Sequence, residues 1–231
     1  AMVPDCPICV PLGEHLSCGV VGKRARCVAL GKNLIVQAAA HHSYCDLRIV
    51  VLCEQEETAQ WEFCRWLPHC WDEGHTARLI ANTPETIRAL LERLEPVFSA
   101  RAAAGQSAGL GAAPRAKPWY LFVCAAPETV TQHAFMKFLT ANRRELGISV
   151  LYLFDRIDLL PEECHDILDC REAVGVLFER RHASRKQPFQ PEQVPQARYE
   201  QFARSMAPLR MEAKGAPALP RSVSFLQGYH V

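Results

Sequence analysis

Long hydrophobic runs and an excess of either charge are both absent from this chain. No apolar run approaches the ~20 residues needed to cross a bilayer, so we expect no membrane insertion by this fragment. The formal net charge is +1 and no basic recognition segment is present, which argues against nucleic acid as a partner. The length of 231 residues and the apolar fraction of 49% instead indicate a globular domain with a substantial core.

The eleven cysteines form neither a disulfide framework nor a complete metal-binding motif. Their number is odd, and most, such as Cys18, Cys53 and Cys124, lie inside apolar segments, as buried thiols in a reducing compartment do. Cys6 and Cys9 form the only CxxC pair, whereas a structural zinc site needs a second pair at comparable spacing. We therefore predict packed thiols and no metal site.

What the chain does contain is a regular alternation of strand-like and helix-like segments through residues 16–180. This pattern predicts an α/β fold with three αβα layers and a mainly parallel, Rossmann- or RecA-like sheet of the P-loop NTPase type. The strands are expected near residues 16–22, 46–53, 76–81, 119–126, 148–155 and 174–180. The helices are expected near residues 24–42, 60–67, 84–98, 128–146, 161–169 and 193–206, with Pro96 bending or ending the third of these.

Two segments stand apart from this alternation. Residues 99–118 are small, glycine-rich and without periodicity, so we expect a mobile surface insertion at about 105–116 within a domain formed by residues 1–180. Residues 181–231 are polar and punctuated by proline, and we expect this extension to pack on the domain and lead toward a following one. It carries apolar anchors: Phe189, Tyr199, Phe202, Phe225, Leu226 and Tyr229.

A nucleotide-binding loop is present only in fragments. P-loop NTPases carry GxxxxGK[ST] at the first strand-to-helix turn, because backbone amides and a lysine hold the phosphates while a hydroxyl holds Mg²⁺. The pair Gly22-Lys23 has Ser17 where the first glycine belongs and Arg24 where Ser or Thr belongs. Gly22, Lys23 and Arg24 are therefore only weak candidates for contacting a nucleotide, and we assign no catalytic residue.

Acidic residues for metal and water are also missing from the expected place. The later strand that should end in acids ends in Cys124-Ala125-Ala126. Asp155 and Asp158 follow another buried strand, where α/β proteins place active sites, so they could bind a metal ion. The interpretation we favour is that they cap a turn.

Other polar clusters have structural interpretations beside functional ones. His69 and Cys70, in the tryptophan-rich run at 61–71, could form a nucleophile and base, but packing of this run on the sheet is more typical. His41-His42 suits the negative end of a helix dipole. Basic residues at 180–186 are either solvated surface or a contact for a phosphate or an acidic partner.

Three stretches give a more specific signal. HHSYCDLRIVVLCEQEETAQWEFCRWLPHCW, FDRIDLLPEEC and LPRSVSFLQGYHV resemble the EssC-like, EccC-related FtsK/SpoIIIE-type ATPases of type VII secretion systems, membrane-anchored proteins in Firmicutes. The resemblance extends over nearly the whole fragment and implies the degenerate ATPase-like domain, called DUF in EccC relatives, that precedes the first motor domain. It places Cys27 and Val28 where an active module has its lysine and serine.

Two main functions follow as expectations from this resemblance. The first is a non-catalytic domain, without cofactor, on the cytoplasmic side of the cell membrane, coupling the membrane and stalk part to the motor domains for protein export. Its partners would be neighbouring ATPase domains of the same chain, other copies in a ring and membrane components. The alternative is a non-standard ATPase that binds ATP and Mg²⁺ through Gly22, Lys23, Arg24 and helix N-terminal amides. A weaker alternative is a DNA-contacting, FtsK-like domain.

Overall fold

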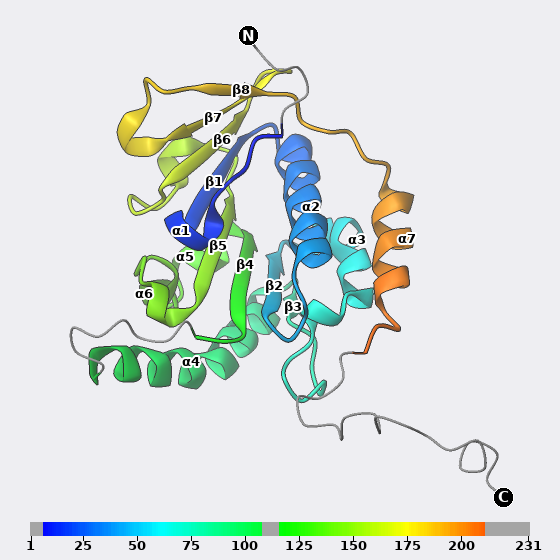
Figure 1. The fold of residues 1–231 in the computed structure, drawn as a ribbon, viewed down its shortest axis with the longest axis vertical. Helices are drawn as coiled ribbons and strands as arrows, with labels where there is room; N and C mark the ends of the chain where they lie inside the picture. Colours follow the sequence, from blue (N-terminus) through cyan, green and yellow to red (C-terminus); the bar gives the residue numbers. More distant parts are fainter. Residues whose placement is uncertain (1–6, 108–115, 211–231) are drawn as a thin grey trace, which may run out of the picture.

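The apolar runs of the chain form one mixed sheet covered by helices on both faces (Figure 1). In this computed structural model, residues 7–107 and 116–210 are described. Within them the sheet has eight strands in the order β3-β2-β4-β5-β1-β6-β7-β8. The strands are β1 (Ser17–Gly22), β2 (Leu47–Cys53), β3 (Ile80–Ala81), β4 (Trp119–Ala125), β5 (Ile148–Leu153), β6 (Asp166–Cys170), β7 (Gly175–Glu179) and β8 (Gln187–Phe189).

The helices differ widely in length. The two long ones are α2 (Arg24–His41) and α4 (Pro84–Ser107), and the shorter α-helices are α1 (Leu12–His15), α3 (Thr58–Trp61), α5 (Pro127–Thr131), α6 (Met136–Leu139) and α7 (Gln196–Met206). Short 3₁₀ turns are η1 (Gln55–Glu57), η2 (Glu62–Trp66), η3 (Pro68–Cys70), η4 (Arg144–Leu146), η5 (Ile157–Leu159) and η6 (Arg180–His182). In the described residues, no helix is both long and apolar enough to span a bilayer.

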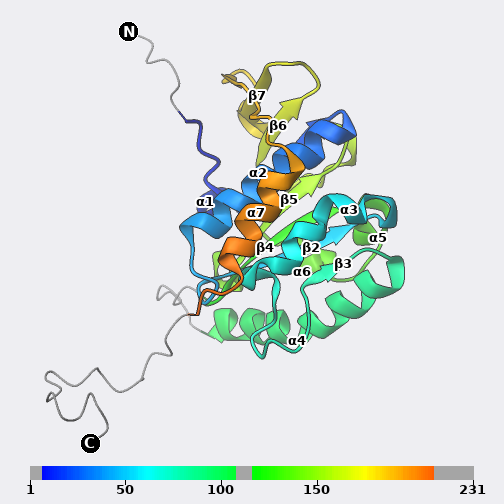
Figure 2. The ribbon, with the colours of Figure 1, turned by 90° about the vertical axis from the view of Figure 1, so that its right-hand side faces the viewer.

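Alternate residues of the central strands supply two separate cores. Ile49 and Val51 of β2 face α2, α3 and α7, while Val50 and Leu52 face α4, α5 and α6. All four are fully buried, because the parallel strands are covered on both faces. Figure 2 shows α7 lying along α2, far from α4 across the sheet. The prediction of a three-layer α/β fold with a mainly parallel sheet is confirmed.

The sheet is parallel at its centre and antiparallel at one edge. The pairs β1–β5, β1–β6, β4–β5, β2–β4 and β2–β3 are parallel, whereas β7 runs antiparallel to both β6 and β8. Five of the six predicted strands lie within a few residues of their expected bounds. The sixth, near 76–81, is only the two-residue β3, because residues 72–78 form a turn closed by Asp72 and Thr76.

The helix predicted at 161–169 is wrong. A turn at Pro161 closes on the amide of Cys164, and the chain then extends as β6 between β1 and β7. Ile167 and Cys170 are fully buried there, one in each of the cores on the two faces of the sheet. Pairing along both edges of this segment overrides its local helical preference.

Three other helix predictions need correction. The single helix expected at 128–146 is interrupted between α5, which ends at Thr131, and α6, which begins at Met136. In this interval the imidazole of His133 accepts the amide proton of Phe135, a bond that competes with the helical pattern. Pro96 does not end α4, which continues to Ser107 through part of the expected insertion. Most of the segment predicted to be mobile lies outside the described residues. The helix expected at 60–67 is a short α3 followed by 3₁₀ turns.

The described part of the C-terminal extension packs on the domain. β8 adds to the sheet edge, and α7 buries Tyr199 and Ala203 against the α2 face. The Tyr199 hydroxyl donates to Asn33 Oδ1 at 2.5 Å, and Phe189 and Phe202 pack against the same core. The anchors Phe225, Leu226 and Tyr229 lie outside the described residues.

Candidate functional site

The connection between β1 and α2 is a single residue. β1 ends at Gly22, Lys23 is the N-cap residue of α2, and the helix begins at Arg24. A phosphate-binding loop needs four residues between its glycines to stack amides around a phosphate. Because the strand passes almost directly into the helix, this turn has no room for that loop.

Gly22 has a packing role at this turn. Its amide donates to the carbonyl of Asp155 at 3.1 Å, and its φ of +141° favours glycine. A β-carbon at this position would lie 2.7 Å from the carbonyl carbon of Cys170. The glycine therefore permits close contact between β1 and the end of β6.

The side chain of Arg24 fills the space at the carboxyl ends of the central strands. Its Nη1 donates to the carbonyl of Leu153 at 2.6 Å, and its Nη2 donates to the carbonyl of Ala125 at 2.5 Å. Its Nε and Nη2 also donate to the two carboxylate oxygens of Glu57, at 2.5 and 2.6 Å. One guanidinium therefore joins α2, β4, β5 and the turn after β2.

The charge of Arg24 is neutralised within the domain. Partial burial opposes this charge, but the hydrogen bonds and charge of Glu57, with a smaller effect of Asp155, outweigh it and raise the pKa of Arg24. The side chains of Arg24 and Glu57 are 27% and 17% exposed. A phosphate could use this guanidinium only by displacing Glu57. Of the three predicted candidates, only Lys23 is an exposed side chain.

The end of β4, where acids for metal-assisted phosphoryl transfer were expected, supplies none. Ala125 and Ala126, at the end of β4, are fully buried and offer no carboxylate. Asp155 lies at 3.5 Å from Arg24 Nη1. Asp158 forms its own pair with Arg156 at 2.5 Å, and the hydrogen bond from Arg156 lowers the pKa of Asp158. Asp155 and Asp158 thus engage different arginines.

The remaining sequence candidates lie elsewhere. Burial lowers the pKa of His69, whose Nε2 donates to the carbonyl of His42 at 2.8 Å. In the basic run at 180–186, Arg180 donates to the carbonyl of Pro161 at 2.5 Å, and the other basic residues are exposed. Cys9 is exposed, while Cys6 lies outside the described residues.

A cleft of about 350 Å³ opens beside β2 and β3. It is lined by Cys53, Thr58, Trp61, Glu62, Arg65, Arg78, Ile80 and Asn82. The indole nitrogen of Trp61 is buried and has no hydrogen-bond acceptor among the described residues. None of the three predicted nucleotide contacts lines this cleft.

Sequence reasoning missed Glu57, the residue that neutralises Arg24. A signal was available, because three glutamates follow the buried strand β2 within four residues. The carboxyl end of a parallel strand is where such side chains meet those of neighbouring strands. What the pattern lacked was the pairing of β2 with β4 and the position of α2.

The chain is similar to type VII secretion proteins over almost its whole length. It is 25% identical over 215 residues to the ESX secretion system protein EccC of Geobacillus thermodenitrificans strain NG80-2, covering 93% of this chain and 14% of that protein. It is 24% identical over 227 residues to the type VII secretion system protein EssC of Staphylococcus aureus strain MSSA476, covering 94% and 15%. No protein-family model matches the chain.

Solved structures of such proteins share the fold. EssC (ATPases 2 and 3) from Geobacillus thermodenitrificans aligns with a TM-score of 0.62 and 10% identity, over 92% of this chain and 48% of that one. The cytoplasmic domain of the Thermomonospora curvata type VII secretion ATPase EccC aligns with a TM-score of 0.57 and 15% identity, over 88% and 29%. The chain thus spans about one seventh of the length of the curated relatives it matches.

Proposed function

Because this chain is homologous to the EccC and EssC proteins of type VII secretion over more than nine tenths of its length, we propose that it is a non-catalytic, ATPase-like domain of a secretion motor. In this role it couples the membrane and stalk part of the motor to neighbouring ATPase domains during protein export. Its partners are those domains, other copies in a ring and membrane components. It works without a cofactor on the cytoplasmic side of the cell membrane.

One observation carries the non-catalytic part of the proposal. The place where an ATPase of this fold binds phosphate has a one-residue connection and is filled by the Arg24–Glu57 pair. Phosphoryl transfer depends on positioning and charge stabilisation, so losing the loop, the hydroxyl and the acids removes the main sources of rate enhancement together.

Calorimetric titration of the fragment with MgATP tests this part. We expect no binding heat at millimolar nucleotide, and phosphate release no faster than in buffer. The non-standard ATPase is the competing function, and it rests on Lys23, which is exposed at the N-terminus of the 18-residue α2. Phosphate release that disappears with Lys23→Ala would refute our proposal and establish that alternative.

The coupling part requires a test in the full-length protein. Phe225, Leu226 and Tyr229 are replaced together by alanine, because the proposal assigns the docking of neighbouring domains to these apolar residues of the C-terminal extension. The control is Val174→Ala, an exposed apolar residue on the sheet domain. We expect the triple variant to lose secretion or assembly at normal abundance, and the control to keep both. Normal secretion and assembly by the triple variant would contradict the coupling role.

A further inference from the structure

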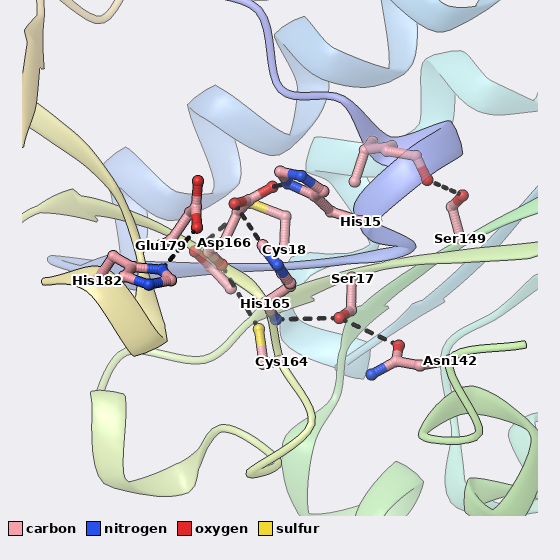
Figure 3. Close-up of polar contacts among 12 residues, drawn as sticks. His15, Ser17, Cys18, Asn142, Ser149, Cys164, His165, Asp166, Glu179 and His182 are labelled. Carbon is pink, nitrogen blue, oxygen red and sulfur yellow. Dashed lines mark hydrogen bonds and ion pairs between the residues drawn. The ribbon is translucent and has the colours of Figure 1, made fainter. Parts of the chain in front are cut away.

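Two histidines and one buried carboxylate converge at the amino ends of the neighbouring strands β1 and β6 (Figure 3). His15 Nδ1 lies 2.8 Å from Asp166 Oδ2, and His165 Nδ1 lies 3.1 Å from Asp166 Oδ1. The imidazole ring centroids are 3.9 Å apart, and one ligand atom from each residue falls within 4.8 Å of the others. This His–His–Asp cluster contains donor types that transition metals prefer.

Pairing of β1 with β6 brings these residues together. The strands are parallel with Cys18 opposite Asp166, so their amino ends are neighbours. His15 is the last residue of α1, and Leu16, with a φ of +66°, turns the chain into β1. The cluster therefore joins the segment entering the domain to a strand 150 residues later in the chain.

Surrounding hydrogen bonds hold the segment that carries His165. The Ser17 hydroxyl accepts the amide proton of His165 at 3.1 Å and donates to the carbonyl of Glu163 at 3.2 Å. Asn142 also donates to that carbonyl, at 2.7 Å, and the amide of Arg180 donates to the His165 carbonyl at 2.8 Å. These contacts fix the backbone from which the His165 imidazole projects.

The exposures of the three side chains suit a site with one open position. The Asp166 side chain is 3% exposed, whereas those of His15 and His165 are 28% and 36% exposed. The carboxylate is thus fixed in the protein, while both imidazoles border solvent, through which an ion and a water ligand can enter. Three protein ligands and one water form the usual arrangement at an open zinc site.

Hydrogen bonding alone is the competing explanation. Each neutral imidazole can donate its Nδ1 proton to one oxygen of Asp166, which satisfies the carboxylate without a metal ion. For bonds of about 2.0–2.1 Å, neighbouring metal ligands lie about 3.0–3.4 Å apart. The observed separations, 2.8 Å to Asp166 Oδ2 and 3.1 Å to Asp166 Oδ1, need to open by a few tenths of an ångström. The ligand atoms, which fall within 4.8 Å of one another, must also draw together around one carboxylate oxygen. The half-exposed imidazoles can make this movement.

We propose that His15, His165 and Asp166 bind one divalent transition metal ion, Zn²⁺, through the two Nδ1 atoms and a carboxylate oxygen. Each imidazole then carries its proton on Nε2 and coordinates through Nδ1 as a neutral ligand, so the ion places one divalent charge beside the buried carboxylate. The bound ion links the segment that contains α1 to the amino end of β6. This site is independent of the proposed non-catalytic role, because it lies at the amino ends of β1 and β6, whereas Arg24 lies at the carboxyl ends of β4 and β5.

The test is a titration with ZnCl₂ against a chromophoric chelator, using the full 231-residue chain with Cys6, Cys9 and Cys45 replaced by serine. These substitutions remove the exposed thiols and the CxxC pair that would compete for zinc. We expect one equivalent to bind with a dissociation constant of about 1 μM or tighter and to raise the melting temperature. Binding should weaken at least about tenfold with His15→Ala and with His165→Ala.

His182→Ala is the matched control. His182 is an exposed histidine near the cluster, but it pairs with Glu179 at 3.0 Å. Its replacement should leave zinc affinity unchanged. Titration with CoCl₂ should give the visible d–d absorption of Co²⁺ bound by nitrogen and oxygen ligands. It should give no thiolate-to-metal charge-transfer band. The proposal is overturned by a dissociation constant above about 100 μM, or by zinc affinity that is unchanged in both the His15→Ala and the His165→Ala variant. A thiolate-to-cobalt charge-transfer band would also overturn it.

Discussion

Replacing Arg24 by alanine removes the side chain that joins four elements at the carboxyl ends of the strands. The carbonyls of Leu153 and Ala125 then lose a charged donor, and the Glu57 carboxylate, 17% exposed, loses its cation. Hydrogen bonds to charged groups contribute about 1.5–3 kcal/mol each when buried, and less where water reaches them. Since Arg24 is 27% exposed, we expect a total loss of about 3 kcal/mol from the free energy of unfolding.

The pairwise share of this loss can be isolated with a double-mutant cycle. Glu57→Ala should destabilise the domain by about 2 kcal/mol, because it leaves a partly buried guanidinium without its carboxylate. The double variant Arg24→Ala/Glu57→Ala should be less destabilised than the sum of the single variants, by about 1–2 kcal/mol. This coupling energy measures the Arg24–Glu57 pair apart from the carbonyl contacts.

Urea unfolding, followed by circular dichroism and tryptophan fluorescence, measures these free energies. For a domain of this size we expect Arg24→Ala to lower the melting temperature by roughly 6–12 °C. Lys23→Ala is the matched control, since it removes an exposed neighbouring cation and should change stability by less than about 0.5 kcal/mol. A loss below about 1 kcal/mol for Arg24→Ala, or a coupling energy below about 0.5 kcal/mol, would refute the reasoning.

Four further predictions concern packing, thiol reactivity and charge. Tyr199→Phe should cost about 1 kcal/mol in urea unfolding, because it leaves Asn33 Oδ1 without a donor in a buried contact; an unchanged midpoint would contradict this. Gly22→Ala should cost about 2–4 kcal/mol through backbone strain and overpacking at the end of β6, so a folded protein of normal stability would count against the packing role. Burial raises the pKa of several thiols to about 12, and at pH 8 such a thiol is only about one part in ten thousand thiolate. The exposed Cys9 and Cys45 should therefore react first with a disulfide reagent, and their replacement by serine should remove two equivalents from the fast phase; an unchanged fast phase would show that other thiols react. With a net charge of +1, weak DNA binding should vanish at physiological salt in a fluorescence titration, and tight binding that persists there would disprove this.

Much of the fold was predictable because its determinants are local. The central strands are continuous apolar runs, such as residues 47–53, and burial on both faces is the environment in which such runs are stable. The missing phosphate loop was also evident from the sequence, because a motif requires particular residues at fixed spacing, and Ser17 and Arg24 break it.

Of the elements predicted wrongly, one depends on distant strand pairing and another on a local side-chain hydrogen bond. Residues 166–170 have a composition compatible with a helix, and only pairing with β1 and β7 makes them a strand. The interruption before Phe135 follows from a side-chain hydrogen bond that competes with the helix. Short segments carry too little periodicity to resist such contacts.

The candidate sites were decided by tertiary structure for the same reason. The sequence indicated that Arg24 stands where a Mg²⁺-binding hydroxyl belongs, but only the sheet order places Glu57 and the ends of β4 and β5 around it. Likewise, His15 and Asp166 are 151 residues apart, and nothing local to either predicts their contact. Residue identity by itself determined which residues of the GxxxxGK[ST] motif are missing from the first strand-to-helix turn, since folding does not change a side chain. Which of the remaining side chains meet depended on strand pairing, which brings together groups that are independent along the chain.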